Sequence, residues 1–238
     1  MINQYIEKIW MANKLPTNSY LNDIPVVQSL ASGWSLDFKK NVTFLVGENG
    51  TGKSTILEAI AVCYGFNAEG GSKNFSFSTR ETEYELENCL KMARKAYAKD
   101  GYFLRSESFF NVATTIDEIE VTGYGNQSLH EQSHGESFLS LFFTRFRGNG
   151  LYILDEPEAA LSPMRQMALL SRMHDLVNDH SQFIISTHSP ILLAYPDAII
   201  YELSSTGIQQ VSYKDTETYT LYSEFLKSPE RMLKHLFE

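Results

Sequence analysis

Apolar residues gather in short runs along the chain, and most runs adjoin a stretch with helical spacing. The first run, Asn41–Val46 (NVTFLV), is rich in β-branched and aromatic residues and predicts a buried strand. After a glycine-rich turn, Ser54–Tyr64 places apolar residues three and four positions apart, as on one face of a helix. Further strands are predicted at Leu151–Leu154, Gln182–Ser186 and Ala198–Leu203. Strands that alternate with helices predict an α/β fold with a mostly parallel central sheet flanked by helices.

Three other segments predict helices. Pro163–Asp179 carries methionine and leucine side chains near one face, and Glu81–Lys99 has the pattern of a charged amphipathic helix. We therefore expect a short helical lobe at approximately residues 79–135, inserted between the glycine-rich turn and the strand at Leu151. The end of the chain, Leu221–Phe237, predicts a pair of helices broken at Pro229.

The chain has 238 residues, of which 43% are apolar and 13% aromatic, enough to bury a sizeable core. No internal repeat, long linker or low-complexity tract divides it, so we expect one domain over residues 1–238. The two cysteines, Cys63 and Cys89, are too few for a disulfide-rich secreted protein and are expected to be reduced thiols.

Charge and hydropathy limit the classes of partner. The net charge of −9 does not support DNA binding, which needs clustered Lys and Arg, although a local basic groove could form in a dimer. No apolar run approaches the about 20 residues that cross a bilayer, and Met1–Pro16 lacks the apolar core of a signal peptide. We therefore expect a cytoplasmic protein with no membrane contact.

The glycine-rich turn, Gly47–Ser54 (GENGTGKS), matches the phosphate-binding pattern G-x-x-x-x-G-K-[ST] in full. Its glycines let the backbone N–H groups point at phosphate oxygens, and the helix that follows directs its positive end at the same anion. Lys53 is expected to contact the β- and γ-phosphates of ATP, and the Ser54 hydroxyl to bind Mg²⁺. The predicted nucleotide-contacting residues of this segment are Gly47, Glu48, Asn49, Gly50, Thr51, Gly52, Lys53, Ser54 and Thr55.

Two carboxylates follow the strand near residue 151, in the sequence LYILDE. Asp155 stands at the carboxyl end of the strand, where it is expected to hold Mg²⁺ directly or through water. Glu156 is one residue further and therefore points in a different direction, so it is expected to orient or deprotonate the attacking water.

Three segments around these carboxylates carry a resemblance to a known family. Asp155–Ser162 (DEPEAALS) resembles the Walker B and D-loop segment of ABC ATPases. Gln132–Glu136 (QSHGE) resembles the signature motif of that family, usually LSGGQ or LSGGE. Ile184–Pro190 (IISTHSP) resembles the strand and switch histidine of the family, which gives His188 that role. With the glycine-rich loop, these motifs occur in family order.

The chain is thus similar to ABC-type P-loop ATPases, and most of all to the SMC/RecF-like branch and to short stand-alone bacterial predicted ATPases. The implied fold is a P-loop NTPase fold, the ABC ATPase head. Three positions depart from the family: His134 replaces a glycine of the signature motif, Ser162 replaces the D-loop aspartate, and no clear Q-loop glutamine is found. Arg105 or Glu107 is expected to substitute for that glutamine, with Glu107 as a candidate metal ligand.

The resemblance implies a composite site in a head-to-tail homodimer formed in the ATP state. The phosphate-binding loop of one protomer would bind ATP, and Ser133, Gly135 and Glu136 of the other would contact its γ-phosphate. Hydrolysis would use Glu156 as the base, Lys53 as the phosphate-binding cation and His188 as the residue that senses or stabilises the γ-phosphate.

Three functions stay open at this point. Glu136 and the DEPE sequence favour an SMC/RecF-like ATPase with a DNA-linked or defence-linked role and a protein partner such as a nuclease or other effector. Only 79 positions separate Ser54 from Ser133, too few for a long coiled-coil arm. A nucleotide-binding subunit of a transporter is disfavoured by the poor Q-loop match. An ATP-gated scaffold with negligible turnover is disfavoured by the presence of Glu156.

Overall fold

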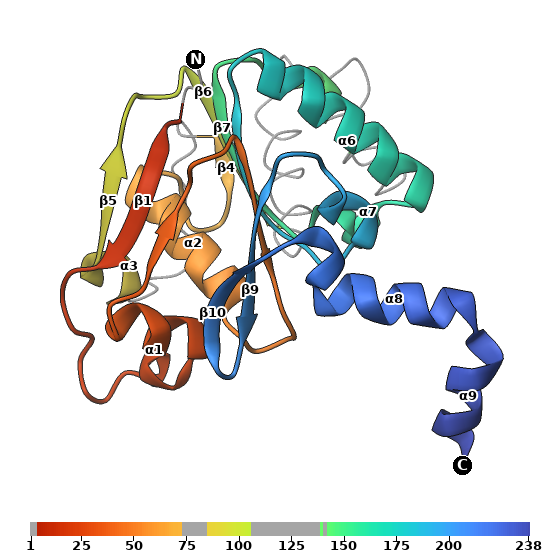
Figure 1. The fold of residues 1–238 in the computed structure, drawn as a ribbon. Helices are drawn as coiled ribbons and strands as arrows, with labels where there is room; N and C mark the ends of the chain where they lie inside the picture. Colours follow the sequence, from red (N-terminus) through yellow and green to blue (C-terminus); the bar gives the residue numbers. More distant parts are fainter. Residues whose placement is uncertain (1–3, 73–84, 106–138, 140–141) are drawn as a thin grey trace.

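The structure is a computed structural model that describes residues 4–72, 85–105, 139 and 142–238 (Figure 1). Its centre is a seven-stranded sheet whose five middle strands are parallel, with an antiparallel strand at each edge. In spatial order the strands are β10 (Gly207–Val211), β9 (Ile199–Ser204), β3 (Val42–Val46), β8 (Gln182–Ser186), β7 (Gly150–Asp155), β6 (Asp100–Arg105) and β4 (Gly71–Ser72). The predicted fold class, α/β with a mostly parallel central sheet, is confirmed.

The predicted apolar runs form the middle of this sheet. Every residue of β3, β7 and β8 is buried. A parallel strand that is covered on both faces has no solvent side, so its sequence is a mostly apolar run instead of an alternating one. All three strands end at the same edge, which brings the residues that follow them together.

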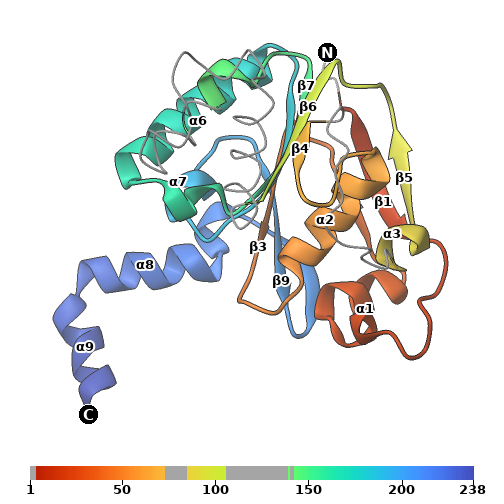
Figure 2. The same ribbon diagram turned by 180° about the vertical axis from the view of Figure 1, so that it is seen from behind.

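One face of the sheet packs against helices from the first part of the chain and a second, smaller sheet. The helices are α1 (Pro25–Ala31) and α2 (Lys53–Tyr64), and the smaller sheet has the antiparallel order β2-β1-β5 (Figures 1 and 2). Its strands are β1 (Ile6–Met11), β2 (Ser35–Asp37) and β5 (Leu90–Arg94). The buried Gln182 of β8 joins the two sheets, because its side-chain oxygen accepts from the N–H groups of Tyr5 and Ile6 at 2.8 and 3.0 Å.

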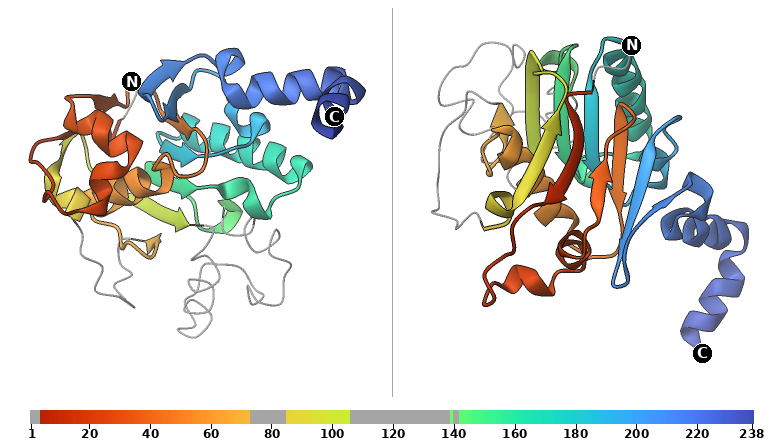
Figure 3. Two further views of the ribbon diagram at one scale, coloured as in Figure 1. Left: turned by 90° about the horizontal axis from the view of Figure 1, so that it is seen from below. Right: turned by 60° about the vertical axis from the view of Figure 1, so that its left-hand side comes forward.

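The other face is covered by α6 (Pro163–Asn178) and α7 (Pro190–Leu193), as Figure 3 shows from two further directions. Leu169 and Met173 of α6 are fully buried in this second core, together with Phe142 and Phe146. The helix predicted at Pro163–Asp179 is confirmed, but the face that carries Met164 and Met167 is exposed, and the helix packs through Leu169, Met173 and Leu176 instead. Two layers of helices, one on each side of the sheet, leave its carboxyl edge accessible.

The chain ends in two helices that project from the body of the molecule (Figure 1). They are α8 (Glu217–Lys227) and α9 (Pro229–Phe237), so the predicted break at Pro229 is confirmed. The buried Thr216 starts α8, because its hydroxyl oxygen accepts from the Tyr219 N–H at 3.1 Å. The remaining short elements are the 3-10 helices η1 (Tyr20–Asp23), η2 (Pro157–Ala160) and η3 (Tyr213–Asp215).

The helix predicted over Glu81–Lys99 is wrong. In the described part of that segment, the helix α3 covers only Glu85–Cys89, and the next five residues form β5. The backbone of β5 pairs with the edge of β1, and this pairing outweighs a helical pattern of side chains. Tyr102 and Phe103, which fall within the residue range of the predicted lobe, are buried in β6 of the central sheet. The other residues of the predicted lobe, 79–84 and 106–135, lie outside the described residues.

Candidate functional site

The predicted phosphate-binding loop connects β3 to α2 at the carboxyl edge of the sheet. Gly47, Gly50 and Gly52 have φ values of +142°, +84° and +96°, a region that disfavours side chains. Gly47 also passes so close to β9 that an added Cβ would lie 2.1 Å from the Leu203 carbonyl oxygen. The loop therefore needs glycine at its first position for both backbone conformation and space.

The helix α1 supports the same loop from outside. The Val26 N–H donates to the Thr51 carbonyl at 3.3 Å, and the Thr51 hydroxyl donates to the Glu48 carbonyl at 2.8 Å. A Cβ added to Gly52 would lie 2.4 Å from Cγ2 of Ile24. The loop is thus held by contacts from α1 and from its own side chains.

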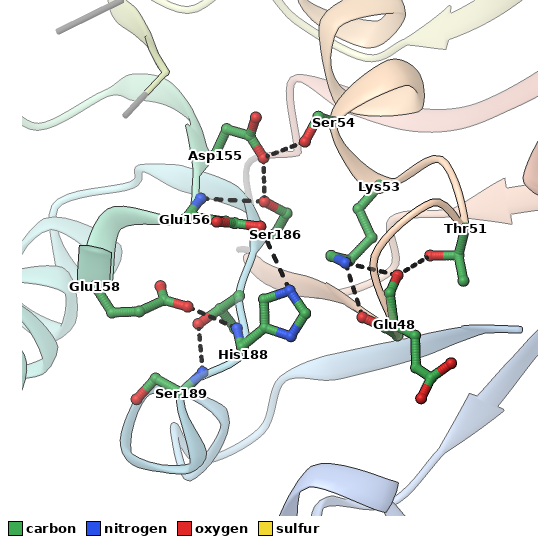
Figure 4. Close-up of polar contacts among 12 residues, drawn as sticks. Glu48, Thr51, Lys53, Ser54, Asp155, Glu156, Glu158, Ser186, His188 and Ser189 are labelled. Carbon is green, nitrogen blue, oxygen red and sulfur yellow. Dashed lines mark hydrogen bonds and ion pairs between the residues drawn. The ribbon is translucent and has the colours of Figure 1, made fainter. Parts of the chain in front are cut away.

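Lys53 is the only cation among the predicted residues of this loop. Its ammonium donates to the carbonyl oxygens of Gly47 and Glu48 at 2.8 and 3.0 Å (Figure 4). Burial lowers the pKa of Lys53, while the negative charges of Glu156, Asp155 and Glu158 oppose that effect. A buried ammonium among carbonyl oxygens and carboxylates is placed to bind a phosphate oxygen.

Ser54 and Asp155 meet although 101 positions separate them in the sequence. The Ser54 hydroxyl donates to Oδ1 of Asp155 at 3.1 Å, and the Ser186 hydroxyl donates to the same carboxylate oxygen. Hydroxyl and carboxylate oxygens are the ligands that Mg²⁺ prefers. Two such oxygens that meet beside the phosphate-binding loop fit a Mg²⁺ that completes its coordination with phosphate and water.

Glu156 and His188 form a second pair beside the first. Glu156 has a φ of +47°, which turns the chain away from the line of β7. Its Oε1 lies 3.4 Å from Nε2 of His188, and both side chains are partly exposed. The carboxylate and the imidazole therefore lie side by side at the rim of the site, where both are accessible to solvent.

Two residues of this site were missed by the sequence analysis. Ser186, the last residue of β8, donates to Asp155 and accepts from the Glu156 N–H at 3.1 Å. Glu158, in η2, accepts from the His188 N–H through its Oε1 at 2.6 Å. The available signals were the second acid in DEPE and the polar residue that ends the apolar run QFIIS.

The predicted signature and Q-loop residues lie outside the described residues, except Arg105. Ser133, Gly135 and Glu136, and the candidate metal ligand Glu107, lie outside the described residues. Arg105 ends β6 directly beside Asp155 in the strand register, and it forms an ion pair with Glu58 at 2.7 Å.

A hollow of about 230 Å³ adjoins the loop and the histidine. It is lined by Gly47, Glu48, His188, Glu202, Glu217, Thr218, Leu221 and Tyr222, so the first turns of α8 border the site. A larger hollow of about 490 Å³ lies at the opposite edge of the sheet, near Lys40 and Asp197, and contains none of the predicted site residues.

The chain is similar to a known protein family. The family described as AAA domain matches residues 27–153, which is more than half of the chain. The chain belongs to the AAA domain family. Among the described helices of this AAA domain protein, none combines the length and apolar character that crossing a bilayer requires.

One protein sequence and two solved structures are examples of what this AAA domain protein is similar to. An uncharacterized ABC transporter ATP-binding protein of Haemophilus influenzae is 26% identical over 221 residues, covering 83% of this chain and 84% of that protein. The ADP conformation of an ATP-binding cassette of an ABC transporter has a TM-score of 0.51 at 15% identity, over 93% of this chain and 99% of that one. The SMC head domain from Thermotoga maritima has a TM-score of 0.46 at 17% identity, over 87% and 99% of the two chains. The cassette similarity shows the predicted fold, that of an ABC-type P-loop ATPase.

Proposed function

We propose that this protein binds ATP with Mg²⁺ and hydrolyses it. The observation that carries the proposal is the meeting of Ser54 with Asp155 at 3.1 Å, in the same site as Lys53. A hydroxyl at the start of a helix, a carboxylate at the end of a strand and a lysine in a glycine-rich loop are the parts that phosphoryl transfer from ATP requires.

Each side chain has a distinct role in the proposed reaction. Lys53 leaves the carbonyl oxygens of the loop and binds the β- and γ-phosphates of the substrate. Mg²⁺, held by Ser54 and Asp155, would neutralise charge on the same phosphates. Glu156 accepts a proton from the attacking water, and His188, beside it, donates a hydrogen bond to the γ-phosphate as it leaves.

The proposal includes a head-to-tail homodimer in the ATP state. Glu156 and His188 are 38% and 41% exposed, so one side of the site is open to solvent in the single chain. Ser133, Gly135 and Glu136 of a second protomer would close that side, as the resemblance of QSHGE to the signature motif implies. ATP would then stabilise the dimer, because only the triphosphate contacts both protomers.

A DNA-linked or defence-linked process with a protein partner is the role that we propose for this ATPase. The relative described as an ABC transporter ATP-binding protein supports a second candidate, a nucleotide-binding subunit of a transporter. The two differ in what should raise turnover: nucleic acid in the first case, and a membrane-embedded partner in the second.

The test is the rate of phosphate release from ATP by the wild-type chain and by Glu156→Gln, each with and without double-stranded DNA. We expect Glu156→Gln to lower kcat by about 100-fold or more, because a general base contributes that much. Equal rates for the two proteins would refute the assigned base. Tight ATP binding with negligible wild-type turnover would instead favour the ATP-gated scaffold, and association with a membrane fraction would favour the transporter subunit.

A further inference from the structure

Glu158 of η2 contacts the segment of residues 187–189, which follows β8 and carries His188. We call this segment the histidine loop. Glu158 and His188 are 30 positions apart in the sequence. Oε1 of Glu158 accepts from the His188 backbone N–H at 2.6 Å (Figure 4). A hydrogen bond to an ionised carboxylate is shorter and about twice as strong as one between neutral groups. The contact therefore fixes the backbone position of His188, independently of its imidazole.

The second oxygen of this carboxylate has a different environment. Oε2 of Glu158 is buried and has no hydrogen-bond partner within the part of the chain that the structure describes. Burial is the main reason that the pKa of Glu158 is raised; hydrogen bonds from the His188 N–H and the Thr187 hydroxyl oppose the shift, and the charge of Glu156 adds to it. The carboxylate thus holds the segment of Thr187 and His188 through hydrogen bonds, while its second oxygen adds none within the described residues.

The contact is one of three that hold His188 and the residue after it in place. Glu156 and Glu158 belong to one turn, and they hold the imidazole at 3.4 Å and the backbone N–H at 2.6 Å respectively. On its other side, the histidine loop is tied to α6, because the Ser189 hydroxyl donates to Oε1 of Gln166 at 2.5 Å. A displacement of η2 would therefore move both groups that hold His188.

We propose that Glu158 is a positioning residue, which holds the backbone of His188 and thereby transmits the position of η2 to the imidazole that faces Glu156. This inference rests on the proposed function in one respect: the proposed reaction gives His188 its contact with the γ-phosphate.

The direct test uses two substitutions of similar volume that differ in hydrogen bonding. Glu158→Gln keeps a side-chain oxygen that accepts from the His188 N–H, and Glu158→Met has no such acceptor. We expect the His188 amide hydrogen of the nucleotide-free protein to exchange with solvent about 10- to 100-fold faster in Glu158→Met, and near the wild-type rate in Glu158→Gln. Exchange at the rate of an unprotected peptide in the wild-type protein would overturn the inference without any variant.

The steady-state kinetics of ATP hydrolysis provide a second test. Glu158→Met should lower kcat about tenfold or more with the KM for ATP changed less than about twofold, and Glu158→Gln should restore most of the loss. The control is Asp197→Asn, which neutralises an exposed carboxylate paired with Lys40 at the opposite edge of the sheet and should change neither value. Equal kcat in the Met and Gln variants would overturn the positioning role.

The two arms separate the inference from the proposed function. If the wild-type chain does not hydrolyse ATP, the proposed function fails, while amide exchange still tests the contact between Glu158 and His188. If Glu158→Met does not fold, wild-type exchange still tests the contact, and Glu158→Ala, which also lacks the acceptor, replaces the Met variant in both measurements. If Glu156→Gln abolishes turnover but Glu158→Met does not change kcat or exchange, only the inference about Glu158 fails.

Discussion

Lys53 is the residue on which nucleotide binding depends most directly. It is 5% exposed, and its ammonium is already held by the two loop carbonyls that face the site. Burial lowers its pKa, and the negative charges of Glu156, Asp155 and Glu158 oppose that effect. When ATP binds, the Lys53 ammonium would exchange the carbonyl oxygens for phosphate oxygens and would stay in the same buried surroundings.

We expect Lys53→Ala to weaken ATP binding about 10- to 100-fold or more, because it removes charge-assisted hydrogen bonds to phosphate. Isothermal titration calorimetry with ATP and Mg²⁺ measures the effect. The control is Lys40→Ala, which removes an exposed lysine at the opposite edge of the sheet. Unchanged affinity in Lys53→Ala would refute the phosphate-binding role of the loop.

The raised pKa of Glu158 predicts a pH dependence of stability. Between the ordinary value of 4.5 and the raised value, the folded protein holds a proton that the unfolded chain has released. The contribution of this carboxyl to the free energy of unfolding is therefore complete below 4.5 and is lost as the pH rises through the folded pKa. Glutamine does not titrate, so Glu158→Gln should gain stability relative to wild type as the pH rises from 4.5 towards neutral.

Urea unfolding of both proteins over that pH range measures the difference. Other carboxyls with raised pKa values, such as Glu58 and Glu87, titrate in both proteins and cancel from it. A difference in unfolding free energy that is independent of pH, or that falls as the pH rises, would contradict the buried state of this carboxyl.

At the scale of single residues, the sequence predicted the site residues that belong to a motif. It missed the residues that join the site only because two distant segments lie side by side. Lys53, Ser54 and Asp155 stand at fixed places beside a strand or helix end, so spacing alone locates them. Ser186 joins the site only because β8 lies beside β7, and Glu158 only because η2 lies beside the histidine loop. Neither neighbourhood can be read from a single sequence.

At the scale of elements, the apolar runs predicted the parallel core because a buried strand shows its burial in its own residues. The strands of the smaller sheet could not be predicted in the same way. They are short and only partly buried, as the pattern of β5 shows with one buried residue in five. Their pairing depends on an edge of β1 that lies about 80 positions away in the chain.

The approach of β9 to the phosphate-binding loop is an element-level contact that can be tested. Gly47→Ala would place a methyl group 2.1 Å from the Leu203 carbonyl oxygen. Gly50→Ala has a positive φ as well, but open space around the added Cβ. We expect a loss of about 3 kcal/mol in the free energy of unfolding for Gly47→Ala and about 1 kcal/mol for Gly50→Ala, since only the first adds overlap to strain.

Urea unfolding at a single pH measures both variants. Equal losses would mean that β9 does not approach the loop as closely as described, and that only backbone conformation requires glycine at residue 47.

At the scale of the whole molecule, the fold places every described site residue at one edge of the sheet, and it leaves Glu156 and His188 accessible there. The first turns of α8 border the same hollow, so this edge is formed by the loop, the histidine and the start of the projecting helices. A second protomer that docks on this edge would meet all three.

The composite site predicts that binding and turnover depend on different protomers. We expect Ser133→Arg to keep ATP affinity within about threefold of wild type and to lower kcat at least about 100-fold, because the residue acts on the ATP of the other protomer. Calorimetry and phosphate release measure the two effects. Equal loss of affinity and turnover would place Ser133 in the site of its own protomer.

The molar mass of Glu156→Gln in solution tests the central claim most directly. Multi-angle light scattering after gel filtration should give one chain, 27.1 kDa, without nucleotide and twice that mass with ATP and Mg²⁺, because the variant binds ATP but does not hydrolyse it. ADP should leave the protein monomeric, since the γ-phosphate is needed to contact both protomers. A mass of one chain in saturating ATP and Mg²⁺ would contradict the composite ATP site.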